Sequence, residues 1–155
     1  MKLSGLELKI PPPVVALIFG AVMWLVADAF PSISAAVPYR RTLSFAFAIL
    51  GVAVALLGVG SFRSARTTVN PLKPETTSSL VTTGIYRYTR NPMYLGMALA
   101  LVGWAVFLGN ALTLIFVAGF MLYMNRFQIA PEERVLANLF GTEFAVYQGK
   151  VRRWI

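Results

Sequence analysis

The sequence predicts an all-α integral membrane protein with about four transmembrane helices. Hydrophobic residues make up 57% of the 155 residues and charged residues 13%, whereas soluble domains carry about 45–50% apolar and about 25% charged residues. Four apolar stretches have a length near the ~17–25 residues that a spanning helix needs. The basic residues cluster at the ends of these stretches that would share one side of the membrane. We expect a single membrane domain over residues 1–155, because the chain is too short for a second domain.

The first two spans are expected within residues 1–62. The first apolar stretch, residues 14–30, follows a run of three prolines. Because no small-residue cleavage site follows it, and Pro31 and Pro38 come next, this stretch is interpreted as a membrane helix and not as a cleavable signal peptide. The second stretch, residues 43–62, is rich in Ala, Val, Leu and Gly and carries no charged residue.

The third and fourth spans are predicted at residues 92–108 and 111–127. Gly109 and Asn110 are the only residues between them, so the two helices must form a tight hairpin over residues 92–127. A hairpin returns the chain to the side of the membrane that it left. The segments before and after the hairpin are therefore expected to meet on one face.

Two segments are expected outside the membrane on that face. Residues 63–91 contain loop-like Asn-Pro and Lys-Pro pairs and are predicted to form a cytoplasmic loop. Residues 128–155 are predicted to form a separate cytoplasmic helical tail, because Pro131 suits a first helical position and the two acidic residues after it suit the positive end of the helix dipole. Gly141 is expected to end this helix, and a short second helix is expected to follow it.

The charged residues predict the orientation. In a four-span topology, twelve of the fourteen lysines and arginines fall on one side of the membrane, and only Arg40 and Arg41 fall on the other. The positive-inside rule makes the side with twelve cytoplasmic. We therefore expect a protein of a bacterial or archaeal inner membrane whose active site faces the cytoplasm. This topology also explains the net charge of +8 without a nucleic acid partner.

The chain contains no cysteine and no histidine. Their absence from the sequence excludes disulfides, thiol chemistry and histidine bases, and it removes the usual ligands of a zinc site. We expect no bound metal, so any chemistry must be built from arginines, tyrosines, carboxylates and backbone groups.

The segment from Gly84 to Gly96 carries polar residues at the edge of a span, where their burial is costly. Asn91 is a good N-cap and Pro92 a good first helical residue, so the third span is expected to begin here. Beside Arg90, the free N–H groups of this helix end favour an anion such as a carboxylate. Gly96, one turn in, would let a ligand or a helix approach closely. The alternative is an interface anchor without chemistry, in which Gly96 packs against a helix.

Glu132 and Glu133 are the second group of candidates. They are expected about one turn beyond the fourth span, on the same side as Arg90. A carboxylate there could hold an ammonium group, so that the carboxylate and Arg90 together would clamp an amino acid. S-adenosylmethionine contains an amino acid group and also a sulfonium, which the electron-rich face of a tyrosine can accommodate. The alternative is that the two acidic residues only stabilise a helix start.

Taken together, these motifs resemble those of the isoprenylcysteine carboxyl methyltransferase and phospholipid methyltransferase families of integral membrane enzymes. The pattern of these families is Gly-x-Tyr, Arg-His/Asn-Pro-x-Tyr-x-Gly, Glu-Glu, Phe-Gly, a tyrosine and a basic C-terminus. Its order and spacing are kept over roughly residues 72–155. The matching residues are Gly84-Ile85-Tyr86, Arg90 to Gly96, Glu132-Glu133, Phe140-Gly141, Tyr147 and Arg152-Arg153.

The resemblance implies S-adenosyl-L-methionine as the cofactor. Combined with the analysis of the residues, it gives two sets of candidates. The expected cofactor-binding residues are Ser78, Ser79, Leu80, Val81, Tyr86, Asn91, Pro92, Met93, Tyr94, Gly96 and Glu132. The candidate catalytic residues are Arg90, Tyr94 and Glu133.

The sequence departs from the prenylcysteine enzymes at several positions. Asn91 and Ser78 stand where those enzymes have histidines, and Phe144 replaces a frequent tyrosine. Their substrate-binding arginine, four residues before the first glutamate, corresponds to Gln128, with Arg126 nearby. Gln128 and Arg126 are therefore the candidate substrate-binding residues, and the resemblance does not extend to a prenylcysteine carboxylate as the acceptor.

The sequence thus predicts an S-adenosylmethionine-dependent methyltransferase that acts on a lipidic or small hydrophobic acceptor at the cytoplasmic membrane face. A carboxylate or thiolate acceptor needs no base, whereas an amine acceptor must lose a proton to Glu133, a tyrosine or water. Two alternatives remain open. One is an inactive membrane scaffold or transport subunit that keeps the motif, and the other is an enzyme related to the sterol reductases, which are similar in this region but much longer.

Overall fold

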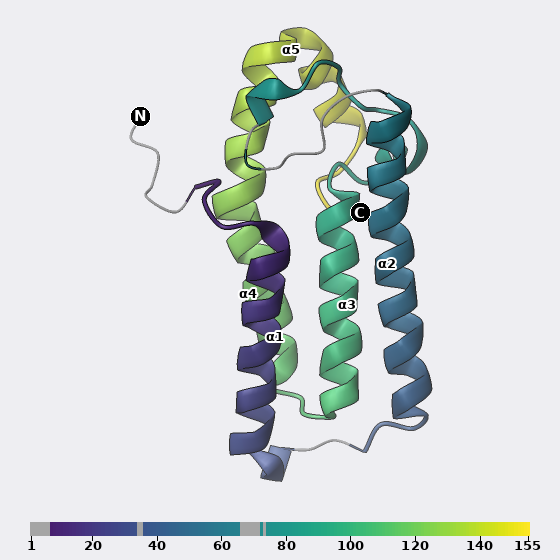
Figure 1. Ribbon diagram of the computed structural model, residues 1–155, viewed down its shortest axis with the longest axis vertical. Helices are drawn as coiled ribbons and strands as arrows, with labels where there is room; N and C mark the ends of the chain where they lie inside the picture. Colours follow the sequence, from purple (N-terminus) through teal and green to yellow (C-terminus); the bar gives the residue numbers. More distant parts are fainter. Residues whose placement is uncertain (1–6, 34–35, 66–71, 73) are drawn as a thin grey trace.

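Long apolar helices determine the shape of the molecule (Figure 1). The computed structural model describes residues 7–33, 36–65, 72 and 74–155, and all regular structure within these residues is helical. The α-helices are α1 (Pro12–Ala29), α2 (Arg40–Ser64), α3 (Pro92–Leu108), α4 (Thr113–Met124) and α5 (Ala130–Lys150). A π-helical turn, Asn125–Ile129, joins α4 to α5, and short 3₁₀ turns lie at Pro31–Ile33, Pro74–Thr76 and Gly84–Arg87.

The predicted membrane fold is confirmed. The helix α1, the helix α2 and the continuous helix formed by α4 and α5 are long and apolar enough to cross a membrane, and α3 is an apolar helix of 17 residues. Large apolar side chains cover the outside of the bundle, as at Leu17, Ile49 and Leu122, which are 69–74% exposed. Such a surface is stable only where lipid covers it, so the chain is an integral membrane protein.

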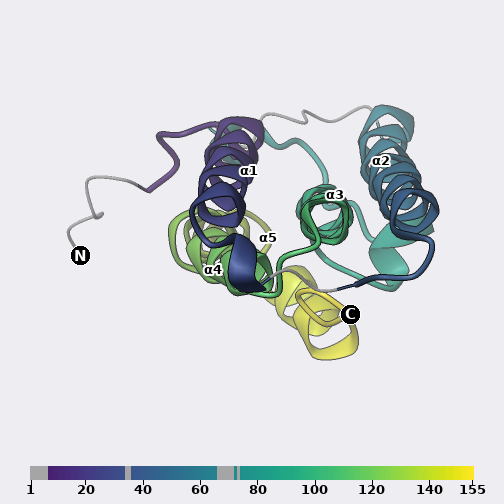
Figure 2. The ribbon, with the colours of Figure 1, turned by 90° about the horizontal axis from the view of Figure 1, so that it is seen from below.

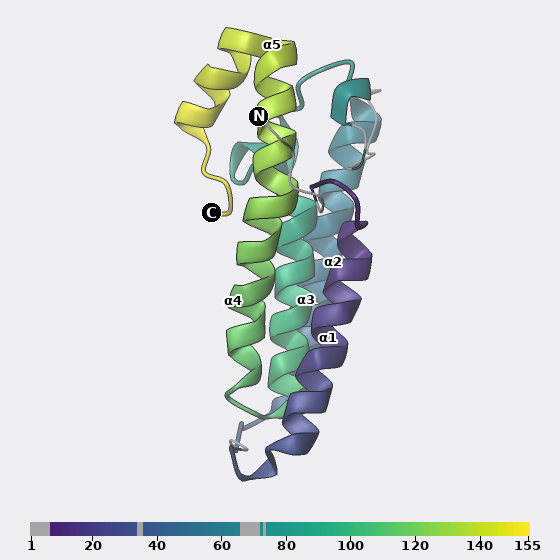
Figure 3. The same cartoon turned by 90° about the vertical axis from the view of Figure 1, so that its left-hand side faces the viewer.

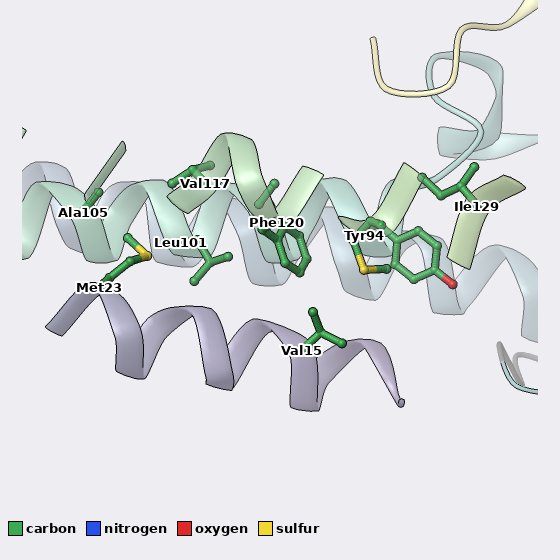
Figure 4. Close-up of a cluster of buried hydrophobic side chains, with 10 residues drawn as sticks. Val15, Met23, Tyr94, Leu101, Ala105, Val117, Phe120 and Ile129 are labelled. Carbon is green, nitrogen blue, oxygen red and sulfur yellow. The ribbon is translucent and has the colours of Figure 1, made fainter. Parts of the chain in front are cut away.

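The helices α1, α3 and α4 pack around one apolar core, while α2 packs on α3 alone among them (Figure 2). Figure 4 shows Val15 and Met23 of α1 directed toward the side chains of α3 and α4, with Phe120 at the centre. The predicted hairpin is also confirmed, since Gly109 ends α3 in the left-handed conformation with φ = 65°. Beside it, the Asn110 side chain donates a hydrogen bond of 2.8 Å to the carbonyl of Phe30 and so ties the hairpin to α1.

The predicted C-terminal helix is present as α5, with Pro131 in its first turn, but it follows the fourth span without a break. The helical run that starts at Thr113 continues to Lys150 over 38 residues, through the π turn and then across a kink at Gly141, where φ = 49°. Pro131 lacks an N–H and would leave the carbonyl of Phe127 without its helical partner. The backbone N–H of Leu8 fills this place at 3.1 Å, so the helical run passes through the proline.

The predicted end at Gly141 is confirmed, because its backbone is not helical and α5 consists of two helices that meet at a kink there. Beyond it, the last part of α5 turns back toward the bundle, so that the C-terminus lies near the start of α3 (Figure 3). The 17 residues of α3 rise about 25 Å, and an equal rise along α4 from Thr113 ends near residue 129. Glu132 therefore lies beyond the membrane-crossing part of its helix.

Glycines hold α2 against α3. A Cβ atom on Gly51 would lie 2.5 Å from the carbonyl oxygen of Gly96, and one on Gly103 would lie 2.8 Å from the carbonyl oxygen of Ser44. Because neither helix can carry a side chain here, the backbones touch along the contact, as small residues allow in membrane helices. Gly96 was expected to bind the cofactor. The structure places it against α2 instead, in agreement with the alternative that it packs a helix.

This contact makes a prediction with a matched control in the same helix. Gly51→Ala should lower the free energy of unfolding by about 1–3 kcal/mol, because the new methyl group overlaps the backbone of α3. A Cβ on Gly60 meets no atom within 4 Å, so Gly60→Ala should be neutral or stabilise the protein by about 0.5–1 kcal/mol through helix propensity. Reversible unfolding in mixed detergent micelles measures both. Equal effects of the two substitutions would contradict the close contact.

Candidate active site

The sequence candidates meet at the end of the bundle where α2 ends and α3 begins. A partly open cavity of about 100 Å³ lies there, between the start of α3, the 74–81 segment and α5. Most of the predicted cofactor-binding and catalytic residues line it. These are Ser79, Leu80, Val81, Tyr86, Arg90, Asn91, Met93, Tyr94, Glu132 and Glu133.

Five predicted residues do not line this cavity. Pro92 is buried beneath α2, where it meets Gly58, and Gly96 lies one turn further along the same contact. Ser78 is exposed beside the cavity. Arg126 pairs with Glu7 at 2.7 Å, and the Gln128 amide donates to the carbonyl of Ile10 at 2.7 Å. The two candidate substrate-binding residues therefore hold the N-terminal segment and do not reach the cavity.

Glu132 directs its carboxyl group toward the first turn of α3. The Tyr94 hydroxyl donates a short hydrogen bond to one of its oxygens, because a helical tyrosine near an N-terminus points back over that end of the helix. Burial raises the pKa of Glu132 to about 8, and the nearby Glu133 adds to the rise against the hydrogen bond from Tyr94. Near neutral pH this carboxyl group is therefore mostly protonated, and a cation placed beside it would favour the ionised form.

Glu133, one residue further on, is fully paired. The Arg90 Nη2 donates to it at 2.8 Å and the Arg153 Nη2 donates at 2.5 Å. The side chains of Arg90 and Glu133 are only 13% and 14% exposed. Both carboxylate oxygens of Glu133 are thus occupied, so Glu133 is unlike the free base that an amine acceptor would require.

Arg90 ties the C-terminal residues to the start of α3. Its Nη1 donates to the carbonyls of Gln148 at 3.0 Å and Val151 at 2.7 Å, and its backbone N–H donates to Arg152 at 3.1 Å. We call residues 151–154 the C-terminal strap. The Nε of Arg90 is buried and has no hydrogen-bond partner among the described residues, so one charged donor of Arg90 is still available.

Asn91 is the N-cap residue of α3 and Pro92 its first residue, as predicted, but the Asn91 side chain forms no capping hydrogen bond. The Asn91 amide donates instead to the carbonyl of Arg153 at 2.9 Å, and the hydroxyl of Thr89 donates to the same carbonyl at 3.3 Å. The C-terminal strap takes up the side chain that would otherwise cap the helix. Since it is the amide that donates, this hydrogen bond explains why an asparagine serves at this position.

Aromatic side chains form much of the remaining wall. The rings of Tyr86 and Phe62 meet edge to face with centroids 5.4 Å apart, and the Tyr147 hydroxyl donates to the Tyr86 carbonyl at 2.8 Å. Burial raises the pKa values of Tyr86 and Tyr147 well above that of a free tyrosine, so both phenols stay neutral. Phe144, which stands where related enzymes often have a tyrosine, is 2% exposed and also lines the cavity.

The candidate list from the sequence missed six lining residues. They are Phe62, Pro74, Thr77, Leu136, Phe144 and Tyr147. Leu136 could have been found, because it lies four residues after Glu132 and therefore on the same helix face. Phe144 and Tyr147 reach the cavity because α5 bends at Gly141, and the apolar spacing of the short helix after Gly141 already indicated that these two residues face inward.

Residues 39–143 match the family model described as phospholipid methyltransferase, which covers α2, all residues that line the cavity except Phe144 and Tyr147, and the start of the bent part of α5. The chain belongs to the phospholipid methyltransferase family. The match includes the Arg90–Gly96 motif and both glutamates, so the family pattern and the cavity coincide along the chain.

Individual relatives are similar over about half of the chain. An uncharacterised protein of Haemophilus influenzae is 48% identical over 63 residues, which are 41% of this chain and 100% of that protein. Protein-S-isoprenylcysteine O-methyltransferases of Schizosaccharomyces pombe and Saccharomyces cerevisiae are 37% and 34% identical over 73 and 82 residues. These segments are 46% and 51% of this chain but only 30% and 33% of the two yeast enzymes.

The ion pairs predict that Glu133 stabilises the fold. Glu133→Gln should lower the free energy of unfolding by about 1.5–3 kcal/mol, because Arg90 and Arg153 both lose a charged acceptor. Hydrogen exchange of the C-terminal strap should become faster in the same variant. Glu143→Gln on the exposed part of α5 is the control and should change stability by less than about 0.5 kcal/mol. A Glu133→Gln protein with parental stability and parental exchange would contradict this role.

Proposed function

We propose that the protein is an S-adenosylmethionine-dependent methyltransferase that acts on a lipidic or small hydrophobic acceptor at the cytoplasmic membrane face. The observation that carries the proposal is the Glu132 carboxyl group. It faces an aromatic-walled cavity at the membrane edge and has Tyr94 as its hydrogen-bond donor. In a member of this methyltransferase family, a carboxylate in such a place is suited to a cationic ligand.

The residues around the cavity fit the three charged groups of S-adenosylmethionine. Glu132 would hold the ammonium group, and the buried Nε of Arg90 would donate to the carboxylate. The rings of Tyr86, Tyr94 and Phe144 would face the sulfonium. Ser79, Leu80, Val81, Asn91 and Met93 complete the proposed binding set. Ser78, Pro92 and Gly96 do not line the cavity, so in this proposal they contribute to cofactor binding only by holding neighbouring residues in place.

The cavity implies that its cover moves when the cofactor binds. The enclosed space of about 100 Å³ is below the ~300–1,000 Å³ of typical ligand sites. Its walls on α3 and α5 are fixed by ion pairs and by the C-terminal strap. We propose that the 74–81 segment, which forms the remaining wall, moves outward to admit the cofactor.

The bound cofactor would supply a methyl group activated by the adjacent sulfonium. The residues of the chain would contribute alignment and exclusion of water. Tyr94 is the proposed catalytic residue nearest to the acceptor side, since its ring lies between the cavity and the apolar core. We retain Arg90 as a residue that positions the cofactor. Because Glu133 is paired with two arginines, an acceptor that needs no base is favoured.

A lipidic acceptor has a route to this cavity from the bilayer. An apolar groove runs between α1 and α3, lined among others by Ala21, Trp24, Met97 and Trp104. Met97 lies one helical turn below Met93, which lines the cavity. One face of α3 therefore leads from the lipid-exposed groove to the proposed reaction site. A chain lying there would place its head near Tyr94.

We also propose the orientation, with one membrane domain whose cavity faces the cytoplasm. The twelve basic residues on the cavity side support it through the positive-inside rule. The test is an impermeant thiol reagent on intact cells, with single cysteines at the exposed Ala36 and Glu75, since the chain has no cysteine of its own. Labelling is expected at position 36 and not at position 75. The opposite pattern would reverse the orientation.

The proposed role of Glu132 predicts how cofactor affinity changes. At pH 8, Glu132→Gln should weaken S-adenosylhomocysteine binding by about ten- to a hundredfold, equivalent to ~1.5–3 kcal/mol for the loss of a charged partner. The affinity of the parent protein should fall as the pH drops from 8 to 6. The carboxyl group, with its pKa of about 8, must release a proton before it can pair with the ammonium, and well below that pKa the loss approaches about tenfold per pH unit.

Calorimetric titration at several pH values measures this behaviour. Glu132→Gln should show a flatter pH profile, because it has no proton to release. Glu133→Gln is the matched comparison, and its folded fraction should bind nearly as the parent does. If Glu132→Gln and the parent bind equally at pH 8, the assignment of Glu132 is wrong. If the parent does not bind S-adenosylhomocysteine at all, a scaffold without cofactor becomes the better interpretation.

A separate prediction concerns the acceptor. Lipid extracts from cells that make the protein should contain a species heavier by one methyl group, and Glu132→Gln should abolish it. Ala21→Phe fills the groove between α1 and α3 and should reduce this product at least tenfold without changing cofactor binding. Ala53→Phe, on an exposed face of α2, is the control. Mass spectrometry measures the methylated product for the parent and for each of the three variants. Equal product from the two phenylalanine variants would eliminate the groove as the route.

A further inference from the structure

The N-terminal residues 7–10 are attached to the helix just before the two glutamates. The Glu7 carboxylate pairs with Arg126 at 2.7 Å and with Arg134 at 2.5 Å, and its side chain is only 4% exposed. Leu8 donates its backbone N–H to the carbonyl of Phe127, and Ile10 accepts from the Gln128 amide. We call residues 7–10 the N-terminal clasp. All of its contacts named here fall on residues 126–134, around the π turn.

The π turn determines which way the two glutamates face. A π turn holds one more residue than an α turn, so every later residue is set back by one position, or about 100° of rotation. Without the extra residue, Pro131 would take the present direction of Glu132. Glu132 would in turn take the direction of Glu133, toward Arg90. The π turn is therefore what allows one carboxyl group to meet Tyr94 while the next one meets Arg90.

The ion pairs of Glu7 match the helix only in its π form. Arg126 and Arg134 lie eight residues apart across the π turn. In an uninterrupted α-helix their directions would differ by about 80°, whereas with the extra residue they differ by about 20°. A single carboxylate can bridge them both when they are nearly aligned. The hydrogen bonds and charges of Arg126 and Arg134 accordingly hold the pKa of Glu7 below its usual range.

Pro131 by itself does not specify the π form. It removes one helical hydrogen bond and leaves the carbonyl of Phe127 without a donor, which favours any bend or widening at this point. The clasp supplies the missing donor through Leu8, at the cost of a positive φ of 56° in a residue that is not glycine. The contacts from Glu7 and Gln128 stand on either side of that hydrogen bond. Together they select one of the several forms that Pro131 allows.

We propose that the N-terminal clasp is a positioning element for the candidate active site, with Glu7 and Gln128 as the positioning residues that fix the direction of Glu132. This inference rests on the proposed function for its catalytic meaning. Its structural content, that the clasp sets the rotation of α5, stands separately and can be measured without any ligand. Arg126 and Gln128, the two candidate substrate-binding residues, therefore bind the N-terminal clasp in this proposal.

The ligand-free experiment measures the rotation. Nitroxide labels on cysteines at the exposed Leu57 and Asn138 report the distance between α2 and α5 by pulsed electron paramagnetic resonance. A rotation of about 100° moves a label carried on a radius of ~5 Å by up to about 8 Å. Glu7→Gln should produce a second, displaced distance population. Gln128→Met, which keeps the side-chain volume and removes the hydrogen bond to Ile10, should do the same.

Glu143→Gln, an exposed charge on the same helix, is the control and should leave the distance unchanged. Glu7→Asp keeps the charge and should restore most of the parental population. If the distance is the same in the parent, Glu7→Gln and Gln128→Met, the clasp does not set the rotation and the proposal is overturned. Should one variant fail to fold, the other still decides.

Binding then tests the catalytic part. Glu7→Gln should weaken S-adenosylhomocysteine binding at least tenfold at pH 8. At pH 7, the number of protons released per bound ligand should also be lower in this variant than in the parent. A role in stability alone would leave proton release per bound ligand unchanged in the folded fraction, and that result would overturn the positioning of Glu132. A parent protein that binds no S-adenosylhomocysteine would instead contradict the proposed function, while the distance measurement would still decide whether the clasp rotates α5.

Discussion

The site depends on two adjacent carboxylates being directed at different partners. Neighbouring residues on an α-helix point about 100° apart, so only one orientation of α5 lets Glu132 meet Tyr94 while Glu133 meets Arg90 and Arg153. The two glutamates then have opposite properties. Glu133 is neutralised by arginines and holds the C-terminal residues in place. Glu132 has a neutral hydroxyl as its hydrogen-bond partner, and burial raises its pKa to about 8. A carboxyl group of this kind gains much from the arrival of a cation.

Both ends of the chain maintain this orientation. The N-terminal clasp holds the helix before Glu132 through Glu7, and the C-terminal strap holds the start of α3 through Arg90. Each end uses a charged side chain that is largely removed from water together with backbone hydrogen bonds. Leaving the Glu7 or the Arg90 charge unpaired would be costly. The clasp and the strap therefore stay bound to the helix turns around the two glutamates. The result is a site on rigid elements, as alignment of two substrates requires.

Much of the fold could be predicted because the membrane simplifies the problem. Apolar length alone gave the spans, and Gly109 and Asn110 gave the hairpin, since a bilayer admits few other arrangements. Short-range motifs also brought Tyr94, Glu132 and Glu133 to one cavity. The backbone partners of the Arg90 side chain could not be predicted, because these carbonyls lie 58 and 61 residues away and face it only after α5 bends. The π turn escaped prediction for a related reason. Pro131 is compatible both with a helix start and with a π turn inside a continuing helix, and only the clasp decides between these two structures.

The same rigidity indicates where motion must occur. On one side, α3 is locked to α2 by backbone contact at Gly51 and Gly96. On the other side, Arg90 and Asn91 bind its first turn to the C-terminal strap. A cofactor larger than the enclosed 100 Å³ therefore cannot enter by parting these helices without breaking several charged contacts at once. The groove between α1 and α3 is lined by other residues than the 74–81 segment, so the proposed movement of that segment leaves the walls of the groove in place.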